Sequence, residues 1–419
     1  MLVFHVDANT AYLSWTAAAL LDRGYGTDLR SIPSAIAGDP ENRHGIILTK
    51  SIPAKKMGIK TGESIFEAKQ KCPDLVIYPP DYDLFMLCSD AMYSILSQYS
   101  SLVQRYSVDE CFLDMTHSAA YRDDPLGTAH EIRERIKDEL GFTVNVGIGE
   151  NKLLAKMASE LKKPDRVHTI WRKEIPQKMW PLPVKELFMV GRASDRKLRY
   201  YGIDTIGMLA NTDPSFLRGI MRSHGQLVYE YANGIDYSPV VPNEEIIQKG
   251  VGNSLTFAYD LLTKKEIYSE ALALCERVAM RLRRLRRRAS LISVSMRSSE
   301  LYYCRHQVQL QSYLNTATEM YAAARMLIDE MWQGQPVRQM GVHVSNFAPP
   351  DEIQLSMFDM KDREYQESLE HTVDDIRRKY GTRSVFRGTF ANSGIDPIQG
   401  GVNDGSYLMM GGYRNEDIG

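Results

Sequence analysis

The chain has 419 residues, a length typical of two to four domains, and its 25% charged and 43% hydrophobic residues exclude a disordered or low-complexity protein. The formal net charge of −2 neither indicates nor excludes a polyanionic partner, while five cysteines without Cys-x-x-Cys spacing and nine scattered histidines argue against a disulfide framework and a zinc site. Because no apolar run approaches the roughly 18–20 residues of a membrane span and the first residues are not those of a signal peptide, we expect a cytoplasmic protein without a membrane partner.

The first 165 residues predict an α+β unit that opens and closes with strands. Segments with alternating or β-forming residues, which predict strands, are 2–6, 46–49, the two halves of 104–115, and 142–148. Segments with helical spacing of apolar residues are 84–100, 126–140 and 153–161. Gly141 and Pro164 follow the last two of these helices and are typical of helix ends.

The remainder of the chain predicts two further domains and a tail. Prolines 176, 181 and 183 precede several short helices at 184–233, and prolines 239 and 242 mark an extended linker. Residues 250–346 then predict the order β-α-β-β-α-β, with elements at 251–259, 266–288, 289–297, 303–311, 316–333 and 338–346. In the tail we expect one helix at 362–380 and loop-like structure over the last thirty residues. The fold class is therefore α+β and multidomain.

Charge is distributed unevenly between the last two segments. Residues 250–348 hold 13 Lys+Arg against 8 Asp+Glu, whereas residues 349–419 hold 8 against 13. An acidic tail behind a basic module predicts separate roles for the two.

Three acidic residues stand at predicted strand ends. Asp7 follows the first strand, and Asp109 and Glu110 lie between two short apolar strands. Neighbouring side chains of a regular strand point to opposite faces, so this pair can converge only where the backbone bends. Because Mg²⁺ binds through a few carboxylates plus substrate phosphates, the three acids could hold two ions for an in-line displacement at phosphorus. The alternative is that Asp109 and Glu110 are solvated turn residues.

Several spaced motifs, in one order, resemble those of the Y-family, or lesion-bypass, DNA polymerases. The motifs are VDANTAY at 6–12, SVDE at 107–110, GIGENKLLAK at 147–156, KKP at 162–164, VGR at 190–192 and GVHVSN at 341–346. They span about residues 1–348. Asn9 and the tail after the last strand resemble the branch that contains the polymerase V catalytic subunit more than the polymerase IV branch.

The resemblance implies a right-hand architecture with an added DNA-binding domain, the little finger. The implied domains are a palm (1–9 and 77–167), fingers (10–76), a thumb with a helix-hairpin-helix (168–240), a linker (241–249), a little finger (250–348) and a tail (349–419). The implied function is template-directed DNA synthesis across damaged DNA by a DNA-directed DNA polymerase of low fidelity, without proofreading. Its place would be the nucleoid in the cytoplasm, and its macromolecular substrate primer-template DNA.

The resemblance also implies a two-metal site. Asp7, Asp109, Glu110 and the carbonyl of Ala8 would bind two Mg²⁺ ions, with deoxynucleoside triphosphates as substrates. The chain has no Gly-x-x-x-x-Gly-Lys-Ser/Thr loop, so metals and cationic side chains would hold the phosphates.

A nucleotide pocket is implied at four residues. Tyr12 would pack under the sugar and clash with a 2′-hydroxyl, unless it is a core aromatic residue at a helix start. Thr49, Lys55 and Lys163 would contact the triphosphate, although a lysine at a helix end, such as Lys163, can be merely solvated. Ile52 and Lys55 stand where many members have Tyr and Arg, which predicts weaker nucleotide affinity or dependence on an activator protein.

Two surfaces are predicted to grip DNA. Gly191 and Arg192 resemble the second half of a helix-hairpin-helix, whose backbone amides would bind a phosphate; alone, the glycine could equally be a helix-packing residue. Residues 281–288 contain six arginines, and the next strand alternates polar with apolar residues. The predicted contacts in this second surface are Arg283, Arg284, Arg287, Ser293, Ser295 and Arg297. A solvated helix or a protein-binding patch is the alternative.

The tail contains QLSMF at 354–358, which resembles the sliding-clamp motif of bacterial polymerases. Leu355 and Phe358 would fill an apolar groove on the clamp, and Gln354 would hydrogen-bond at its edge. A pentapeptide can match by chance. Two other functions remain open for the whole chain: another two-metal palm enzyme such as a nucleotide cyclase, and a non-catalytic DNA- and clamp-binding repair accessory protein.

Overall fold

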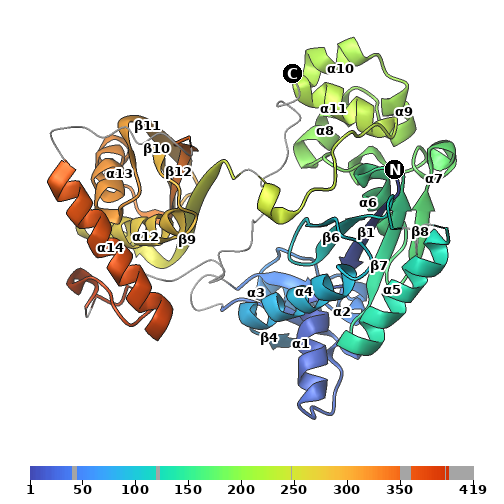
Figure 1. Cartoon of the computed structure of the whole chain (residues 1–419), viewed down its shortest axis with the longest axis horizontal. Coiled ribbons are helices and arrows are strands. Elements are labelled where there is room, and N and C mark those ends of the chain that lie inside the picture. Colours follow the sequence, from blue (N-terminus) through green and yellow to red (C-terminus); the bar gives the residue numbers. More distant parts are fainter. Residues whose placement is uncertain (40–44, 119–122, 247, 350–359, 392, 396–419) are drawn as a thin grey trace. The chain divides into compact units, whose positions relative to one another are not determined.

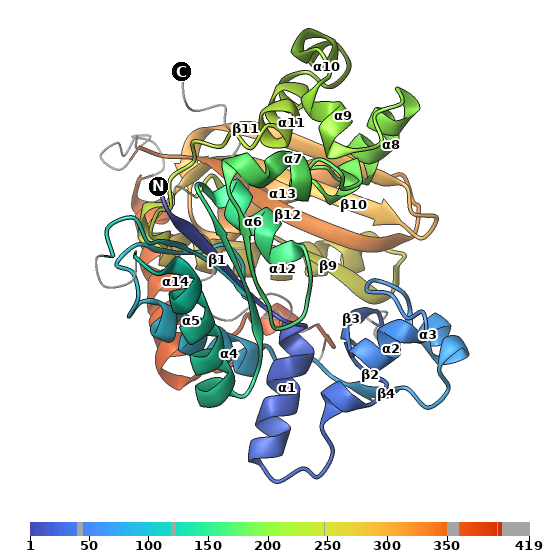
Figure 2. The same ribbon diagram turned by 90° about the vertical axis from the view of Figure 1, so that its right-hand side faces the viewer.

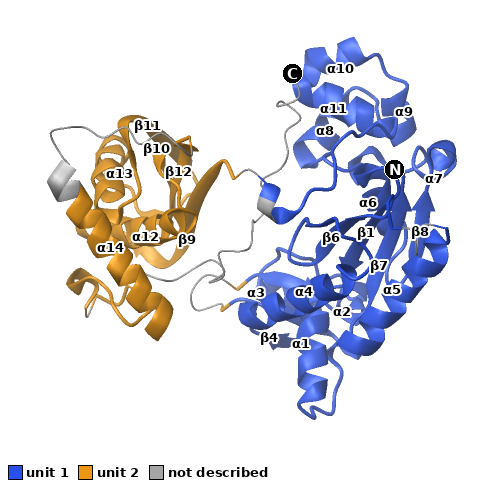
Figure 3. Cartoon of the chain, in the orientation of Figure 1, with its two compact units in different colours: residues 1–38, 46–246, 412–419 blue, residues 39–45, 247–411 orange. Residues whose placement is uncertain are grey.

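The computed structural model describes residues 1–39, 45–118, 123–246, 248–349, 360–391 and 393–395 (Figure 1). They form two compact units, chiefly residues 1–246 and 248–395 (Figure 3). The division falls within the proline-marked segment 241–249. No helix among the described residues is both long and apolar enough to cross a bilayer.

A five-stranded sheet forms the centre of the first unit. Its order is β5-β6-β1-β7-β8, with bounds β1 Val3–Ala8, β5 Val103–Arg105, β6 Glu110–Asp114, β7 Val144–Gly149 and β8 Val167–Ile170. All of these strands were predicted except β8. The central strand, β1, is buried throughout and pairs antiparallel with both β6 and β7. This register puts Asp7 opposite Glu110 on one side and Asn145 on the other.

Helices cover both faces of this sheet. Helices α1 (Ala11–Asp22), α4 (Tyr82–Leu96) and α5 (Pro125–Leu140) pack on one face, where α4 and α5 lie side by side (Figure 2). Helix α6 (Lys152–Glu160) packs on the other face, against β1 and β7. Gly147 of β7 allows that close approach, since a Cβ there would lie 2.0 Å from the carbonyl oxygen of Ala155. Because strand residues alternate, Asp7 is on the α6 face.

Two smaller bodies flank the five-stranded sheet. Strands β2 (Ser34–Ala37), β3 (Ile47–Lys50) and β4 (Val76–Tyr78) form a separate sheet with α2 (Ile52–Lys56) and α3 (Ile65–Lys71). Beyond β8 come the short helices predicted between 184 and 233: α8 Arg192–Tyr200, α9 Ile206–Ala210, α10 Pro214–Met221 and α11 Ser223–Ala232, after α7 Ile175–Lys178. Their core is continuous with the outer face of α6.

The second unit confirms the predicted β-α-β-β-α-β order. Strands β9 (Gly250–Leu261), β10 (Ala289–Ser298), β11 (Tyr303–Leu314) and β12 (Val337–Phe347) form an antiparallel sheet in the order β11-β10-β12-β9. Helices α12 (Lys264–Arg284) and α13 (Ala317–Met331) pack on this sheet around a shared core. Helix α12 ends four residues earlier than predicted, and Arg286 takes a left-handed conformation with φ of 53° in the turn into β10.

The predicted tail helix is present as α14 (Met360–Tyr380), and it belongs to the second unit. It brings carboxylates onto the basic end of α12. Arg283 is 4% exposed and donates to Asp374 at 2.7 and 3.0 Å and to Glu370. The prediction of a DNA contact at Arg283 is therefore withdrawn, because its guanidinium is buried and paired. Its neighbour Arg284 is exposed, and Arg287 is half-buried.

Arg283 and Arg284 offer a matched pair for testing this packing. Arg283→Ala should leave Glu370 and Asp374 with only the longer contacts of Arg387 (3.3 Å) and Arg377 (4.0 Å). It should weaken the docking of α14 by about 3 kcal/mol, or roughly 100-fold in hydrogen-exchange protection of α14 amides. Arg284→Ala, at an exposed position, should change protection by less than about 1 kcal/mol. Equal protection in the two variants would contradict the buried role of Arg283.

Candidate active site

Three carboxylates converge where β1 ends and β6 begins. Among the described residues, the ligand oxygens of Asp7, Glu110 and Glu160 all lie within 4.8 Å of one another. The β1–β6 register pairs Asp7 with Glu110, and Glu160 is the last residue of α6, which packs over the same face. Glu160 was not predicted as a site residue.

Asp109 is adjacent to this group but not a member of it. Its carbonyl oxygen accepts a hydrogen bond from the backbone N–H of Ala8 (2.9 Å), and Ser107 Oγ donates to its carboxylate (2.5 Å). Burial raises the pKa of Asp109, and the Ser107 hydrogen bond opposes that shift. Of the three predicted carboxylates, the structure thus brings Asp7 and Glu110 together and holds Asp109 in the neighbouring turn.

Two lysines supply the opposite charge. Lys156 Nζ donates to both oxygens of Glu110 at 2.8 Å. Lys163 Nζ donates to Asp7 and to Glu160, each at 2.8 Å. Lys163 was predicted from the sequence, whereas Lys156 was missed as a functional residue. A signal was available, since Lys156 closes the motif at 147–156 and lies four residues before Glu160, on the same side of a helix.

Burial and these lysines determine the electrostatics of the site. Burial raises the pKa of Asp7 well above its usual value, although Lys163 opposes the shift. Burial would also raise the pKa of Glu110, but its contacts with His5 and Lys156 outweigh that and lower it. Burial, with a smaller effect of Lys156, lowers the pKa of His5 to about 4, so its imidazole is neutral at pH 7. All the acidic donors here are carboxylate oxygens, which fit a hard divalent cation such as Mg²⁺.

Tyr12 lies in the first turn of α1, five residues after Asp7. Its ring stacks on Phe85, with centroids 4.5 Å apart and an interplanar angle of 20°, and meets Trp15 edge-on at 6.0 Å. The side chain is half-buried. The two aromatic neighbours therefore fix the orientation of the ring, as either of the two predicted roles would require.

The other predicted nucleotide contacts lie on the small sheet and α2. Thr49 is half-buried in β3, and Lys55 is exposed on α2. Sequence analysis missed Lys50, whose pKa is lowered by burial and by the charge of Lys55. Two lysines that repel each other in this way favour a bound anion. Ile52, at the start of α2, is 44% exposed, so it presents an apolar side chain there.

Gly191 caps the N-terminus of α8 and is exposed, as is Arg192. A Cβ at Gly191 would meet no atom within 4 Å. The glycine is therefore not required for helix packing, and the amides at this helix end are open to a ligand.

In the second unit, the predicted contacts on β10 differ in exposure. Arg297 is exposed and Ser295 is half-buried, but Ser293 is 2% exposed because Arg305 of β11 covers it and donates to its hydroxyl at 2.9 Å. The surface group at that point is thus Arg305, which sequence analysis missed. The strand register places it beside Ser295.

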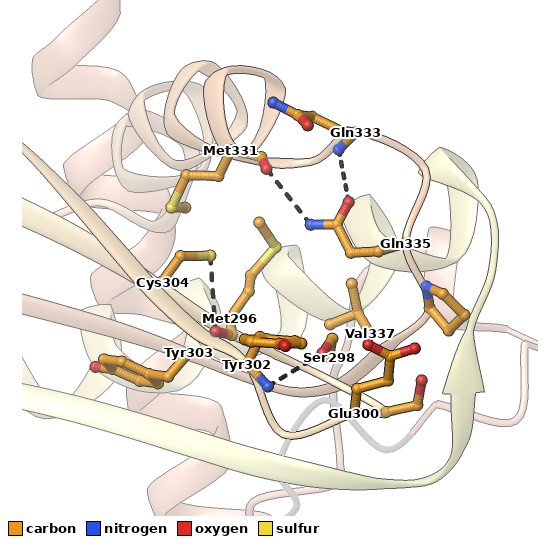
Figure 4. A pocket seen from close by; sticks show the side chains of 12 residues that line it. Met296, Ser298, Glu300, Tyr302, Tyr303, Cys304, Met331, Gln333, Gln335 and Val337 are labelled. Atoms are coloured by element: carbon orange, nitrogen blue, oxygen red, sulfur yellow. Dashed lines mark hydrogen bonds between the residues drawn. The ribbon is translucent and has the colours of Figure 1, made fainter.

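A cavity of about 430 Å³ lies where the β10–β11 hairpin meets the end of α13 (Figure 4). None of the predicted site residues lines this cavity. Polar groups there bond one another: Gln335 accepts from the backbone N–H of Gln333 at 2.8 Å and donates to the carbonyl of Met331 at 3.5 Å. The predicted clamp peptide 354–358 lies outside the described residues.

Two family models match the chain. The impB/mucB/samB family matches residues 6–160, and the C-terminal domain of that family matches residues 248–357. Among solved structures, a Y-family DNA polymerase chimera, Dbh-Dpo4(243-245)-Dbh, is similar with a TM-score of 0.71 at 20% identity. That similarity covers 83% of this chain and 99% of the chimera.

Curated relatives cover nearly the whole chain. It is 44% identical to DNA polymerase IV of Clostridium acetobutylicum over 92% of this chain and 97% of that protein. It is 37% identical to DNA polymerase IV of Acetivibrio thermocellus (92% and 96%) and 33% identical to DNA polymerase IV 1 of Bacillus subtilis (92% and 92%).

These names do not support the predicted placement in the branch that contains the polymerase V catalytic subunit. One residue behind that prediction, Asn9, has a local role in the structure. It is buried, donates to Asn145 at 3.1 Å and accepts from Thr143 and from the backbone N–H of Asp165. A residue that satisfies buried polar groups around β1 carries no information on the branch.

Proposed function

The chain belongs to the impB/mucB/samB family, the Y-family DNA polymerases, and we propose that Asp7, Asp109 and Glu110 carry its nucleotidyl transfer. It is a DNA-directed DNA polymerase that extends a primer on a template, across lesions. The observation that supports this site is the convergence of Asp7 and Glu110 where β1 ends and β6 begins, with a lysine bound to each carboxylate.

In this proposal Asp7, Asp109, Glu110 and the carbonyl of Ala8 would hold two Mg²⁺ ions. When bound, these ions supply Lewis acidity at the primer hydroxyl and at the triphosphate. The protein contributes fixed positions: Lys156 grips both oxygens of Glu110, and Ser107 holds Asp109. Lys163 lies between Asp7 and Glu160, where its ammonium can move to a triphosphate oxygen while Glu160 retains it.

The two competing functions are less well supported. A non-catalytic accessory protein has no need for buried carboxylates with paired lysines, and the relatives are named as polymerases. A nucleotide cyclase has no need for the second unit, which has a basic strand surface at Arg297 and Arg305.

Asp109→Asn tests the chemistry. It removes one metal-binding charge from a buried turn and keeps the acceptor for Ser107, so we expect primer extension on abasic and undamaged templates to fall at least about 100-fold. Primer-template affinity, measured by anisotropy, should stay within about twofold. Asp114→Asn, at the opposite end of β6, is the matched control and should extend normally. Near-normal extension by Asp109→Asn would remove this residue from the catalytic set.

We also propose that Tyr12 selects the sugar. Its ring is five residues from Asp7 and is held by Phe85 and Trp15, so it cannot easily turn aside for a 2′-hydroxyl. Thr49, Lys50 and Lys55 are proposed to bind the triphosphate. The apolar Ile52 and the change from guanidinium to ammonium at Lys55 favour weaker nucleotide binding, and an activator protein would compensate for it.

Tyr12→Ala should therefore raise kcat/KM for ribonucleotides relative to deoxynucleotides by about 10-fold or more, because a steric clash is lost. Single-nucleotide kinetics with matched dNTP and rNTP measure this ratio. Tyr12→Phe keeps the ring and should keep the wild-type ratio. An unchanged ratio in the alanine variant would leave Tyr12 with a packing role alone.

DNA is proposed to bind at two separate surfaces through its phosphates. One is the open helix end at Gly191 and Arg192. The other, in the second unit, is the face of the sheet that carries Ser295, Arg297 and Arg305. Arg284 and Arg287, at the end of α12, are proposed as further phosphate contacts. Such contacts are salt-dependent and nearly blind to sequence, as copying of damaged templates requires. The enzyme would then act at the nucleoid in the cytoplasm.

The clamp-binding proposal rests on the sequence QLSMF at 354–358. Leu355 and Phe358 are two large apolar side chains three residues apart, and burying each in a groove contributes roughly 1.5–3 kcal/mol. Tethering to a ring around DNA raises the effective concentration at the primer end.

Leu355→Ala combined with Phe358→Ala should leave clamp-free extension unchanged and abolish stimulation by the clamp. Calorimetry with purified clamp should show a loss of binding of at least about 10-fold. Wild-type affinity of the double variant for the clamp would refute the motif.

A further inference from the structure

Phe188 lies in the segment before α8, and its half-buried ring contacts the lysine that binds Glu110. None of the roles described above uses it. Lys156 Nζ, which donates to both oxygens of Glu110, lies over the rings of Tyr106 and Phe188, 5.1 and 5.6 Å from their centroids. Both distances are within the roughly 6 Å of a cation–π interaction. The two rings are 6.1 Å apart and inclined at 68°, so they form a corner that faces the ammonium.

The two rings come from different parts of the first unit. Tyr106 lies between β5 and β6, and its backbone N–H donates to the carbonyl of Glu110 at 2.9 Å, so it is fixed to the carboxylate's own strand. Phe188 instead stacks on Tyr231 of α11, with centroids 6.1 Å apart, and packs on the core of the short helices. Phe188 therefore connects those helices to Lys156.

A tight turn fixes the position of Phe188. The backbone N–H of Val190 donates to the carbonyl of Leu187 at 3.0 Å, and both of these side chains are buried. Phe188 and Met189 are thus the central residues of a β-turn, and Met189 has φ of 70°, a value that favours glycine there. A strained residue of this kind persists only where the surrounding structure determines the backbone. The turn also directly precedes Gly191, where α8 begins and a DNA phosphate is proposed to bind.

We propose that Phe188 is a positioning residue that acts through Lys156, because its ring keeps the ammonium on Glu110. The inference rests on the proposed catalytic role of Glu110. An ammonium on a flexible four-carbon stem is poorly fixed by one carboxylate. A ring face attracts it without competing for the carboxylate. Through the turn, the position of Lys156 depends on the segment that is proposed to hold a DNA phosphate. The alternative is that Phe188 only packs on the short helices.

Substitutions at Phe188 separate positioning from packing. Phe188→Leu keeps an apolar side chain but removes the ring, so it should lower kcat about 5- to 20-fold, with KM for dNTP and affinity for primer-template within about threefold. Phe188→Tyr keeps the ring and should stay within about twofold of wild type. Phe216→Leu is the matched control. It removes a ring of α10 that meets Tyr201 at 5.3 Å, and it should leave all three constants unchanged.

A double-mutant cycle with Lys156→Met tests the route of the effect. If Phe188 acts through Lys156, the double variant should have the kcat of Lys156→Met within about twofold, whereas independent effects multiply. Multiplied effects would overturn the proposal, as would wild-type kcat in Phe188→Leu or in Lys156→Met. A Phe188→Tyr variant as impaired as Phe188→Leu would also overturn it. Normal extension by Glu110→Gln would reject the catalytic role of Glu110, whereas its inactivity beside a fully active Phe188→Leu rejects the inference about Phe188 alone.

Nuclear magnetic resonance of chelator-treated protein without DNA gives a readout that is independent of activity. Protons over a ring face are shielded, so the ε-protons of Lys156 should resonate at lower frequency than those of an exposed lysine. Carbon-13 labelling of the lysine ε-carbons makes them visible, and the signal lost in Lys156→Met assigns them. The shift should shrink in Phe188→Leu and persist in Phe188→Tyr. Should the leucine variant fail to fold, the wild-type spectrum still decides, because ε-protons at the ordinary lysine position would overturn the proposal.

Discussion

The proposed active site depends on one constraint: two carboxylates are brought together by strand register, and their charge must be neutralised because they are partly buried. Because β1 pairs antiparallel with β6, Asp7 is opposite Glu110, and neither can move without breaking the sheet. Like charges this close and this shielded from water are unfavourable unless cations accompany them. These cations are Lys156 of α6 and Lys163, which follows the end of that helix. The same unfavourable charge makes the site suitable for divalent ions, which would deliver more positive charge at the same point.

Helix α6 links this site to the rest of the first unit. Its inner face packs so closely on the sheet that Gly147 and Gly149 have no room for a side chain. Its outer face shares a core with the short helices that follow β8. Its N-terminus is tied to the same region, since Asn151 donates to the carbonyl of Gly234 at 2.9 Å. A displacement of those helices would therefore move Lys156, and with it the charge that holds Glu110. Lys156 also lies over the rings of Tyr106, between β5 and β6, and Phe188, before α8, at 5.1 and 5.6 Å. It therefore contacts both the central sheet region and the segment that leads into the short helices.

The parts of the fold and of the proposed site that could be predicted from the sequence are those that depend on local interactions. Alternation and helical spacing located most strands of the central sheet, helices α4, α5 and α6, and every element of the second unit, because both patterns depend on neighbours within a few residues. They did not locate β2, β4, α2 or α3, and they gave no bounds for α1. Asp7 and Glu110 were recognisable because strand ends can be read from the same pattern. The small strand β8 has no such alternation and pairs only with β7, so it was missed. The partners of individual charges were not predictable, because they come from distant segments: Lys156 is 46 residues from Glu110, and Arg305 covers Ser293 from another strand. Asn9 misled the branch prediction because its polar partners, Thr143, Asn145 and Asp165, lie more than 130 residues away.

The arginine-rich end of α12 shows why composition alone is a poor guide to a nucleic-acid surface. Six arginines in eight residues look like one basic patch, but a packed helix has a buried face and an exposed face. Arg283 points inward, and its charge is met by Glu370 and Asp374 of α14, while Arg288 pairs with Glu367 of the same helix at 2.7 Å. In the opposite direction, Arg377 of α14 donates to Glu276 of α12 at 3.2 Å. Reciprocal pairs of this kind specify where α14 docks, and they use part of the acidic charge of the tail. The acidic tail and the basic module are therefore not simply separate in role, because part of each is bound to the other, and the DNA contacts proposed for this region are confined to its outward-facing arginines.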